Sequence, residues 1–200
     1  MIKSAVGEEL DAWIHRLFPF VFWGRLNPNA LTVAGAAVST GAAWALASGA
    51  LFAGALLILF GGFFDLVDGV VARHHGISSR FGAFLDSTLD RWVDAVLLVG
   101  LSVHFARQGE PGHVALAGAA LALSFLVSYS KARAELVLES FDVGWMERGE
   151  RIGVLALGCA LGFPVLALWI IAAGSAVTAA QRIATAQREM ARLEEREESP

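Results

Sequence analysis

Long apolar runs alternate with short polar clusters along the whole of this 200-residue chain. The hydrocarbon core of a membrane is about 30 Å thick and is crossed by about 20 residues of α-helix, and most of the runs are about that long. They cover residues 30–48, 50–72, 83–106, 113–137, 148–162 and 164–186. The pattern predicts an all-α integral membrane protein with six transmembrane helices.

The residues before the first run follow a different pattern. Residues 5–24 mix acidic and basic residues with large aromatic and aliphatic ones, which is typical of an amphipathic helix lying in the membrane interface. After this segment, Asn27 and Pro28 predict a turn. Asn29 is then the expected N-cap of a helix that begins at Ala30.

Composition agrees with a membrane protein. Hydrophobic residues make up 56% of the chain, charged residues make up 17%, and the mean hydropathy is +0.59; these values exclude an ordinary soluble domain. The one cysteine excludes a disulfide framework within the chain. Acidic residues precede the first apolar stretch, unlike the basic start of a cleavable signal peptide, so we expect the first run itself to direct insertion. The only shift in composition is the charged tail after about residue 187, and it does not divide the chain into domains, so we expect a single membrane domain over residues 1–200.

Positive charges are concentrated on one side of the predicted spans. They lie near the N-terminus, between the second and third runs, between the fourth and fifth runs, and towards the C-terminus, whereas the opposite connections carry only Arg107. Because basic residues favour the cytoplasmic side, this pattern predicts a multi-pass protein of the cell membrane with both termini in the cytoplasm. Half of the net charge of −4 comes from residues 187–200, which carry five glutamates and three arginines and which we expect to form a charged cytoplasmic tail.

Four aspartates occupy the end of the second run and the start of the third. Asp65 and Asp68 are three residues apart, and Asp86 and Asp90 are four apart, so each pair shares one face of a helix. Ionised carboxylates in a membrane need partners that offset their charge, and carboxylate oxygens are ligands of hard cations such as Mg²⁺ or Mn²⁺. The four aspartates therefore predict a divalent-metal site at the cytoplasmic surface of the membrane.

The residues around these aspartates suit a ligand that carries phosphate. Gly69, Ala72 and Gly82 leave room beside the carboxylates. Arg73 can bind a phosphate through two N–H groups at once. Metal ions, a guanidinium and an uncrowded backbone together indicate a nucleotide or a pyrophosphate.

The complete spacing resembles the signature of the CDP-alcohol phosphotransferases, also called CDP-alcohol phosphatidyltransferases, with every defining position filled. In this chain it reads Asp65-x2-Asp68-Gly69-x2-Ala72-Arg73-x8-Gly82-x3-Asp86-x3-Asp90. The six-span layout and the cytoplasmic placement are similar to that family too, so the resemblance covers most of the chain. Members transfer a phosphatidyl or related group from a CDP-linked lipid to an alcohol and release CMP.

The resemblance implies a role for each matching position. The four aspartates would hold two divalent ions, Mg²⁺ or Mn²⁺, on the pyrophosphate, and Asp90 would also be the general base that takes the proton of the acceptor hydroxyl. The residues that would contact the CDP-lipid are Asn29, Ala30, Leu31, Thr32, Gly69, Ala72, Arg73, Ser79 and Gly82. Asp94, a further turn along the same face, could share the task of the base. His74 and His75 lie outside the signature and are expected in a solvent-exposed loop. The resemblance also implies a homodimer.

A second polar cluster is expected on the same side of the membrane, where the fourth run ends and the fifth begins. Its cations would suit an acceptor that carries its own phosphate, and they are Lys131, Arg133, Arg148 and Arg151. Ordinary juxtamembrane charges, partly neutralised by nearby glutamates, are the alternative interpretation.

The acceptor cluster resembles one branch of the family. The segments SYSKARAE and ERGER, and the stretch AVTAAQRI at residues 176–183, are similar to those of the branch that makes phosphatidylinositol phosphate in actinobacteria. By that match Lys131, Arg133 and Arg151 would hold the inositol phosphate. The chain departs from the branch at Gly149, where the branch has proline, and in FDVGW, which lacks the usual glycine-rich approach.

We therefore expect a membrane phosphatidyltransferase that uses CDP-diacylglycerol and a phosphorylated polyol, with inositol phosphate as the first candidate, membrane lipid as its surroundings and no nucleic acid as a partner. Glycerol 3-phosphate suits the same cations and is the alternative acceptor. A membrane cation transporter is the alternative of a different class. It predicts acidic residues near mid-membrane in several spans, whereas here the acidic residues gather at one end of two spans. The intact signature argues against a non-catalytic scaffold.

Overall fold

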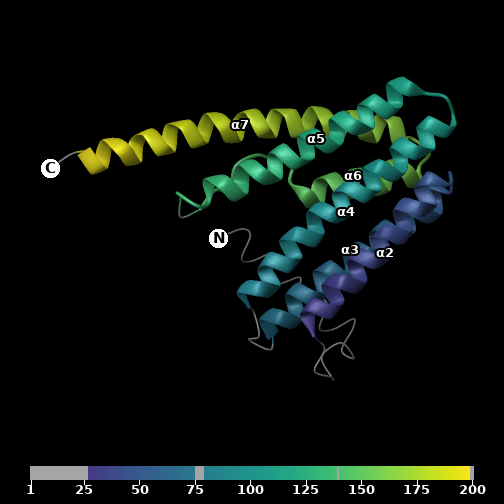
Figure 1. The fold of residues 1–200 in the computed structure, drawn as a ribbon, viewed down its shortest axis with the longest axis horizontal. Helices are drawn as coiled ribbons and strands as arrows, with labels where there is room; N and C mark the ends of the chain where they lie inside the picture. Colours follow the sequence, from purple (N-terminus) through teal and green to yellow (C-terminus); the bar gives the residue numbers. More distant parts are fainter. Residues whose placement is uncertain (1–26, 75–78, 139, 199–200) are drawn as a thin grey trace.

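A computed structural model describes residues 27–74, 79–138 and 140–198 (Figure 1). Within these ranges the chain forms six α-helices and no β-strand. The helices are α2 (Pro28–Ala47), α3 (Leu51–His74), α4 (Arg80–Arg107), α5 (Pro111–Ala134), α6 (Arg148–Ala160) and α7 (Pro164–Glu198). The predicted all-α fold is confirmed. Predicted and observed ends agree within three residues, except that α7 runs to Glu198 instead of ending at 186. The interfacial helix predicted for residues 5–24 lies outside the described residues.

Three of the described helices are long and apolar enough to cross a membrane. They are α2, α5 and α7, and a shorter apolar segment, Leu51–Val67, lies within α3. Helix α6 has 13 residues, which at 1.5 Å per residue amounts to about 20 Å. Helix α4 carries several charged residues in its first half. The count of six transmembrane helices therefore stays a prediction.

Helix α2 begins earlier than its sequence predicts. Asn27, and not Asn29, is the N-cap, because its side chain accepts a hydrogen bond from the backbone N–H of Asn29 at 3.0 Å. Pro28 occupies the first helical position, where the backbone N–H makes no hydrogen bond within the helix, so the absence of this group in proline has no cost. The prediction of a turn at these two residues was wrong because proline is as well suited to a first helical turn as to a turn in a loop.

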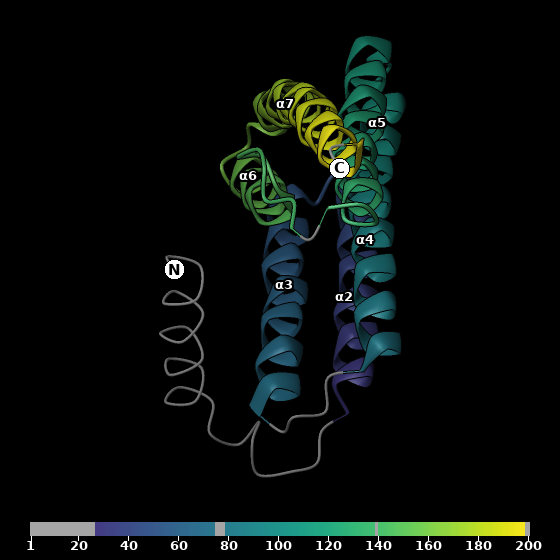
Figure 2. The same cartoon turned by 90° about the vertical axis from the view of Figure 1, so that its left-hand side faces the viewer.

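The helices form two connected groups. Helix α2 packs against α3 and α4, α5 packs against α7, and contacts of α4 with α5, of α3 with α6 and of α6 with α7 join the groups. Figures 1 and 2 show α2, α3 and α4 running alongside one another, while α7 projects beyond α5 at its C-terminal end. The start of α2, the end of α3 and the start of α4 consequently lie at the same end of the bundle, and this end carries the signature residues.

Small residues allow α2 to lie very close to its two neighbours. A Cβ atom on Gly100 of α4 would lie 2.5 Å from the carbonyl oxygen of Ala43 on α2. On the other side, a Cβ on Gly35 of α2 would lie 3.1 Å from the carbonyl oxygen of Gly61 on α3. Without a hydrophobic driving force between helices in lipid, such close backbone contact is a main source of association. It brings the acidic parts of α3 and α4 together on α2.

We predict that Gly100→Ala destabilises the protein. The added methyl group meets backbone on α2, which cannot move aside as a flexible side chain would, and overpacking of this kind typically costs about 1–3 kcal/mol. Thermal unfolding of the purified protein in detergent would measure the change.

The matched control for this variant is Gly118→Ala on α5, where an added Cβ would have nothing within 4 Å. The control should unfold at the temperature of the parent protein or slightly above it, because alanine favours a helix more than glycine does. Equal unfolding temperatures for the two variants would contradict the role given to Gly100.

Candidate functional site

Three of the four signature aspartates come together between α3 and α4. Asp65 lies on α3, Asp86 and Asp90 lie one turn apart on α4, and one carboxylate oxygen of each is within 4.8 Å of the others. All three side chains are half-buried. Converging carboxylate oxygens fit a hard divalent cation such as Mg²⁺ or Mn²⁺. Asp68 lies one turn along α3 from Asp65, and its side chain is outside the described part of the structure.

The guanidinium group of Arg148 contacts two carboxylates of this cluster. Its Nη1 donates a hydrogen bond to Oδ2 of Asp65 at 2.7 Å and lies 3.0 Å from Oδ1 of Asp90. Its Nε lies 3.9 Å from Oδ1 of Asp94. From the sequence, Arg148 is expected only in the acceptor pocket. Its contact with the aspartates joins two groups of residues that the sequence analysis treats separately.

Residues predicted to contact the CDP-lipid gather where α2 and α4 begin. Ser79 is the N-cap of α4, and its hydroxyl accepts a hydrogen bond from the backbone N–H of Gly82 at 2.9 Å. A Cβ atom on Gly82 would lie 3.1 Å from both Oδ1 of Asn29 and Oγ of Ser79. The three residues are therefore neighbours in the structure. Helix N-termini attract phosphate groups, and neither first turn here contains an acidic residue.

The remaining predicted CDP contacts lie on the same two helices or on α3. Ala30, Leu31 and Thr32 follow Asn29 at the start of α2, where Thr32 is buried and its hydroxyl donates to the carbonyl oxygen of Pro28 at 3.0 Å. Near the end of α3 lie Gly69, Ala72 and Arg73, whose side-chain surroundings are outside the described part of the structure. His74, expected in a loop, is instead the last residue of α3, and His75 lies outside the described residues. The roles given to these α3 residues stay predictions.

A cavity of about 250 Å³ lies beside the aspartate cluster and is lined by residues of α4, α5, α6 and α7. Three of the four predicted acceptor-binding cations line it: Lys131, Arg148 and Arg151. Asp90 lines it too. Arg133 is exposed and is not among the lining residues. The structure thus brings three of these cations together and leaves Arg133 apart from them.

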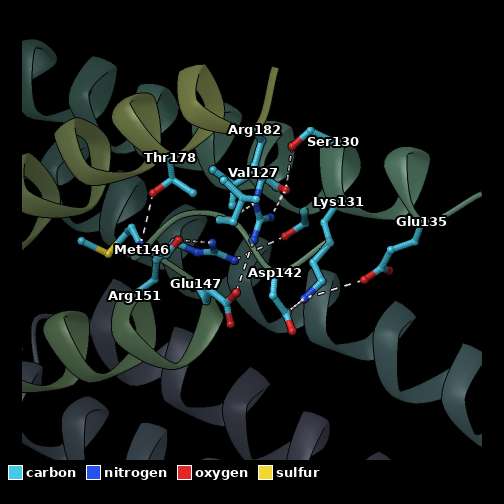
Figure 3. Close-up of polar contacts among 12 residues, drawn as sticks. Val127, Ser130, Lys131, Glu135, Asp142, Met146, Glu147, Arg151, Thr178 and Arg182 are labelled. Atoms are coloured by element: carbon cyan, nitrogen blue, oxygen red, sulfur yellow. Dashed lines mark hydrogen bonds and ion pairs between the residues drawn. The ribbon is translucent and has the colours of Figure 1, made fainter. Parts of the chain in front are cut away.

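Arg182 of α7 is a further cation of this cavity (Figure 3). It is 2% exposed, and it donates from Nε to the carbonyl oxygen of Val143 at 2.8 Å and from Nη1 to that of Val127 at 2.5 Å. Its Nη2 lies 3.4 Å from a carboxylate oxygen of Glu147. Sequence reasoning gave Arg182 no role, although an arginine inside a predicted span is itself a signal of function.

Asp94 and Arg151 form a buried ion pair in the wall of the cavity. Nη2 of Arg151 lies 2.8 Å from Oδ2 of Asp94, and the two side chains are 4% and 5% exposed. Arg151 also donates to the carbonyl oxygen of Met146 at 3.3 Å. Because either charge would be unfavourable if buried alone, the pair holds both side chains in place. The geometry favours Asp94 as the partner of Arg151 over Asp94 as a second base.

The connection between α5 and α6 is held in place by α7. The hydroxyl oxygen of Thr178 accepts a hydrogen bond from the backbone N–H of Met146 at 3.2 Å (Figure 3). Gly144 packs against Thr178 with a φ of 95°, a conformation that favours glycine. Gly149, where the similar branch has proline, lies in the first turn of α6 with open space around it. Proline is compatible with a first helical turn, so this departure does not alter where α6 begins.

Known proteins resemble this chain over most of its length. A family model described as CDP-alcohol phosphatidyltransferase matches residues 25–187. A phosphatidylinositol phosphate synthase of Streptomyces avermitilis is 40% identical over 181 residues, covering 83% of this chain and 74% of that protein.

Two crystal structures of the Mycobacterium tuberculosis phosphatidylinositol phosphate synthase have a similar fold at 30% sequence identity. The structure with CDP-DAG bound has a TM-score of 0.75 and matches 91% of this chain and 94% of its own chain. The structure in complex with manganese and citrate has a TM-score of 0.76 and matches 90% and 88%.

The family model covers most of the chain, including all four signature aspartates and the cations of the cavity. The relatives match it at 30% identity or more over most of their own length. The resemblance predicted from the signature is therefore confirmed, and the chain belongs to the CDP-alcohol phosphatidyltransferase family.

Proposed function

We propose that this protein transfers the phosphatidyl group of CDP-diacylglycerol to a phosphorylated polyol, with inositol phosphate as the first candidate, and releases CMP. The position of Asp90 carries the proposal. Its carboxylate belongs to the aspartate cluster and also lines the cationic cavity. The same group therefore faces both the place for the pyrophosphate and the place for the acceptor.

In this reaction Asp90 takes the proton from a hydroxyl group of the acceptor. The hydroxyl oxygen forms a bond to the phosphorus of the phosphatidyl group, and the bond from that phosphorus to the bridging oxygen of the pyrophosphate breaks. CMP leaves with the bridging oxygen. The side chain of Asp90 is 18% exposed, so it can reach a substrate in the cavity. Positioning of the two substrates accounts for much of the rate in such transfers.

The signature aspartates Asp65, Asp68, Asp86 and Asp90 would hold two Mg²⁺ ions, or Mn²⁺ in their place. When bound, the ions supply positive charge that stabilises the attacking and leaving oxygens. The three described carboxylates and the manganese complex of the M. tuberculosis relative support a divalent ion here.

The CDP part of the lipid would lie across the starts of α2 and α4. Asn29, Ser79 and Gly82 would contact it there, and Arg73 at the end of α3 would bind its phosphates. Two adjacent helix N-termini without acidic residues support this position. The complex of the M. tuberculosis relative with CDP-DAG supports the choice of lipid.

An acceptor that carries its own phosphate would occupy the cationic cavity, with Lys131, Arg148, Arg151 and Arg182 around it. Charged side chains of this kind bind phosphate strongly, and arginine can do so through two N–H groups. Inositol phosphate is preferred because the S. avermitilis and M. tuberculosis relatives are phosphatidylinositol phosphate synthases. Glycerol 3-phosphate is the second candidate because it offers the same phosphate on a smaller polyol.

The membrane arrangement belongs to the same proposal. Six helices would cross the cell membrane, with both termini and the site on the cytoplasmic side, and two copies would form a homodimer. The three long apolar helices and large exposed side chains such as Trp44 and Trp169 support contact with lipid. A cation transporter fits less well, because the described acidic cluster involves only two helices, in the C-terminal half of α3 and the N-terminal half of α4, and lies beside an arginine.

A direct test supplies the purified protein in detergent with CDP-diacylglycerol, Mg²⁺ and one acceptor at a time: inositol phosphate, glycerol 3-phosphate, free inositol or serine. We expect CMP release with inositol phosphate, because the cavity offers cations for its phosphate. Release with free inositol or serine alone would contradict the assignment of the cavity to a phosphorylated acceptor.

Removal of one carboxylate should weaken metal binding. We predict that Asp86→Asn raises the Kd for Mn²⁺ by roughly tenfold or more, since even residues that only support a metal ligand contribute 10–100-fold in affinity. Titration of Mn²⁺ followed by electron paramagnetic resonance would measure this, and a chelator should abolish CMP release by the parent protein. Glu110→Gln at the start of α5 is the control, and a Kd equally raised in both variants would contradict the site.

The acceptor cavity can be tested by comparing two arginines. We predict that Arg151→Gln raises the KM for the acceptor by about tenfold or more and that for CDP-diacylglycerol much less, because Arg151 lines the cavity. Arg133→Gln removes the same charge from an exposed position outside it and should change neither KM.

Arg151→Gln also leaves Asp94 buried without its partner, so the variant has a second effect to separate. Lys131→Gln avoids this problem, because Lys131 is 29% exposed, and it should raise the same KM. Unchanged acceptor KM in both Arg151→Gln and Lys131→Gln would remove the cavity from the proposed function.

A further inference from the structure

Arg148 belongs to two groups that the proposed function uses separately. Its Nη1 lies 2.7 Å from Oδ2 of Asp65 and 3.0 Å from Oδ1 of Asp90. The same side chain lines the cavity assigned to the acceptor phosphate. One guanidinium is thus within reach of both the expected metal ligands and the expected acceptor.

A guanidinium that pairs with Asp65 and Asp90 competes with a divalent cation for the same carboxylate oxygens. A carboxylate oxygen that ligates a divalent cation has less electron density to offer an N–H donor, and the cation repels a guanidinium beside it. Arginine stays charged in proteins, so Arg148 needs another anion when it leaves the carboxylates. A phosphate group is such an anion, and arginine can bind it through two N–H groups.

The surroundings of Arg148 leave it able to change partners. Its side chain is 25% exposed, and its Nε is buried without a hydrogen-bond partner. Gly149 follows it with open space around the backbone. Arg151, one turn further along α6, differs because its side chain is 4% exposed and is paired with Asp94.

We propose that Arg148 couples the metal site to the acceptor cavity: it pairs with Asp65 and Asp90 until divalent cations bind there, and it then turns to the phosphate of the acceptor. The second half of this inference, the contact of Arg148 with the acceptor phosphate, rests on the proposed function. Coupling of this kind is reciprocal, so the metal favours acceptor binding and the acceptor favours metal binding. The acceptor is thereby held most tightly when the metal site is filled.

The test is a titration of the full chain in detergent with Mn²⁺, followed by electron paramagnetic resonance, with and without saturating inositol phosphate and with free Mn²⁺ matched between the two series. In the parent protein inositol phosphate should lower the Kd for Mn²⁺ by about fivefold or more, the usual lower range of coupling between sites. Arg148→Gln should bind Mn²⁺ about fivefold more tightly than the parent protein without acceptor, because no guanidinium competes. In this variant, inositol phosphate should change the Kd for Mn²⁺ by less than about twofold.

Arg133→Gln is the matched control, since it removes one positive charge at an exposed position away from the cavity, and it should behave as the parent protein does. An unchanged or higher Kd for Mn²⁺ in Arg148→Gln would overturn the competition. Undiminished coupling in that variant would show that another contact links the sites, and would overturn the role of Arg148 in coupling.

Should Arg148→Gln fail to fold, Arg148→Met provides the same test, because methionine keeps an unbranched apolar stem but carries no charge that competes with the cation. It should also bind Mn²⁺ more tightly than the parent protein, and an unchanged Kd would overturn the proposal. The Mn²⁺ titration without acceptor needs no turnover. If no acceptor supports CMP release but Arg148→Gln binds Mn²⁺ more tightly, the proposed function is therefore refuted. The competition between Arg148 and the metal for the aspartates would still stand.

Discussion

Repulsion among three carboxylates at one end of a largely apolar helix bundle is the constraint on which the rest of the structure depends. Asp65, Asp86 and Asp90 bring oxygens within 4.8 Å of one another, and two unit charges 4 Å apart repel by about 4 kcal/mol at an effective dielectric constant of 20. The guanidinium of Arg148 lies within hydrogen-bonding distance of two of them. Because α6 begins at Arg148, its contact with Asp65 places the start of α6 against α3. A separate hydrogen bond, from the backbone N–H of Met146 to Thr178, holds the α5–α6 connection against α7.

The close packing of α2 produces this concentration of charge. Gly35 and Gly61 let α2 approach α3, and Gly100 lets α4 approach α2 at the backbone of Ala43. Helices α3 and α4, which carry the aspartates, are thereby both held against α2, with their aspartates close together. Larger side chains at these positions would separate α3 from α4, so the small residues in the middle of the bundle determine the distances in the site at its end.

The sequence predicts local features of this protein well and long-range ones poorly. Helix positions followed from the apolar runs and from the polar clusters that separate them. Helix geometry also explains the different places of the predicted cations. Arg148 and Arg151 are three residues apart and share a helix face, whereas Lys131 and Arg133 are two apart and do not. The same rule, applied to the sequence, separates Arg133 from the cavity. The pairing of Arg148 with Asp65 joins residues 83 positions apart, and no local pattern encodes which of several anions an arginine contacts.

Four of the five cations that line the cavity fall into two kinds, and the difference bears on how the proposed site would be filled. Arg151 and Arg182 are buried and hydrogen-bonded to backbone carbonyl groups, so their charges have nearly the same position with or without a ligand. Lys131 and Arg148 are 29% and 25% exposed and pair with carboxylates, which a phosphate can replace. Fixed cations present a preorganised field that attracts the phosphate at little cost in entropy. In the proposed function, cations that exchange partners would respond to the metal in the neighbouring site, so affinity for the phosphate and its dependence on the metal would come from different residues.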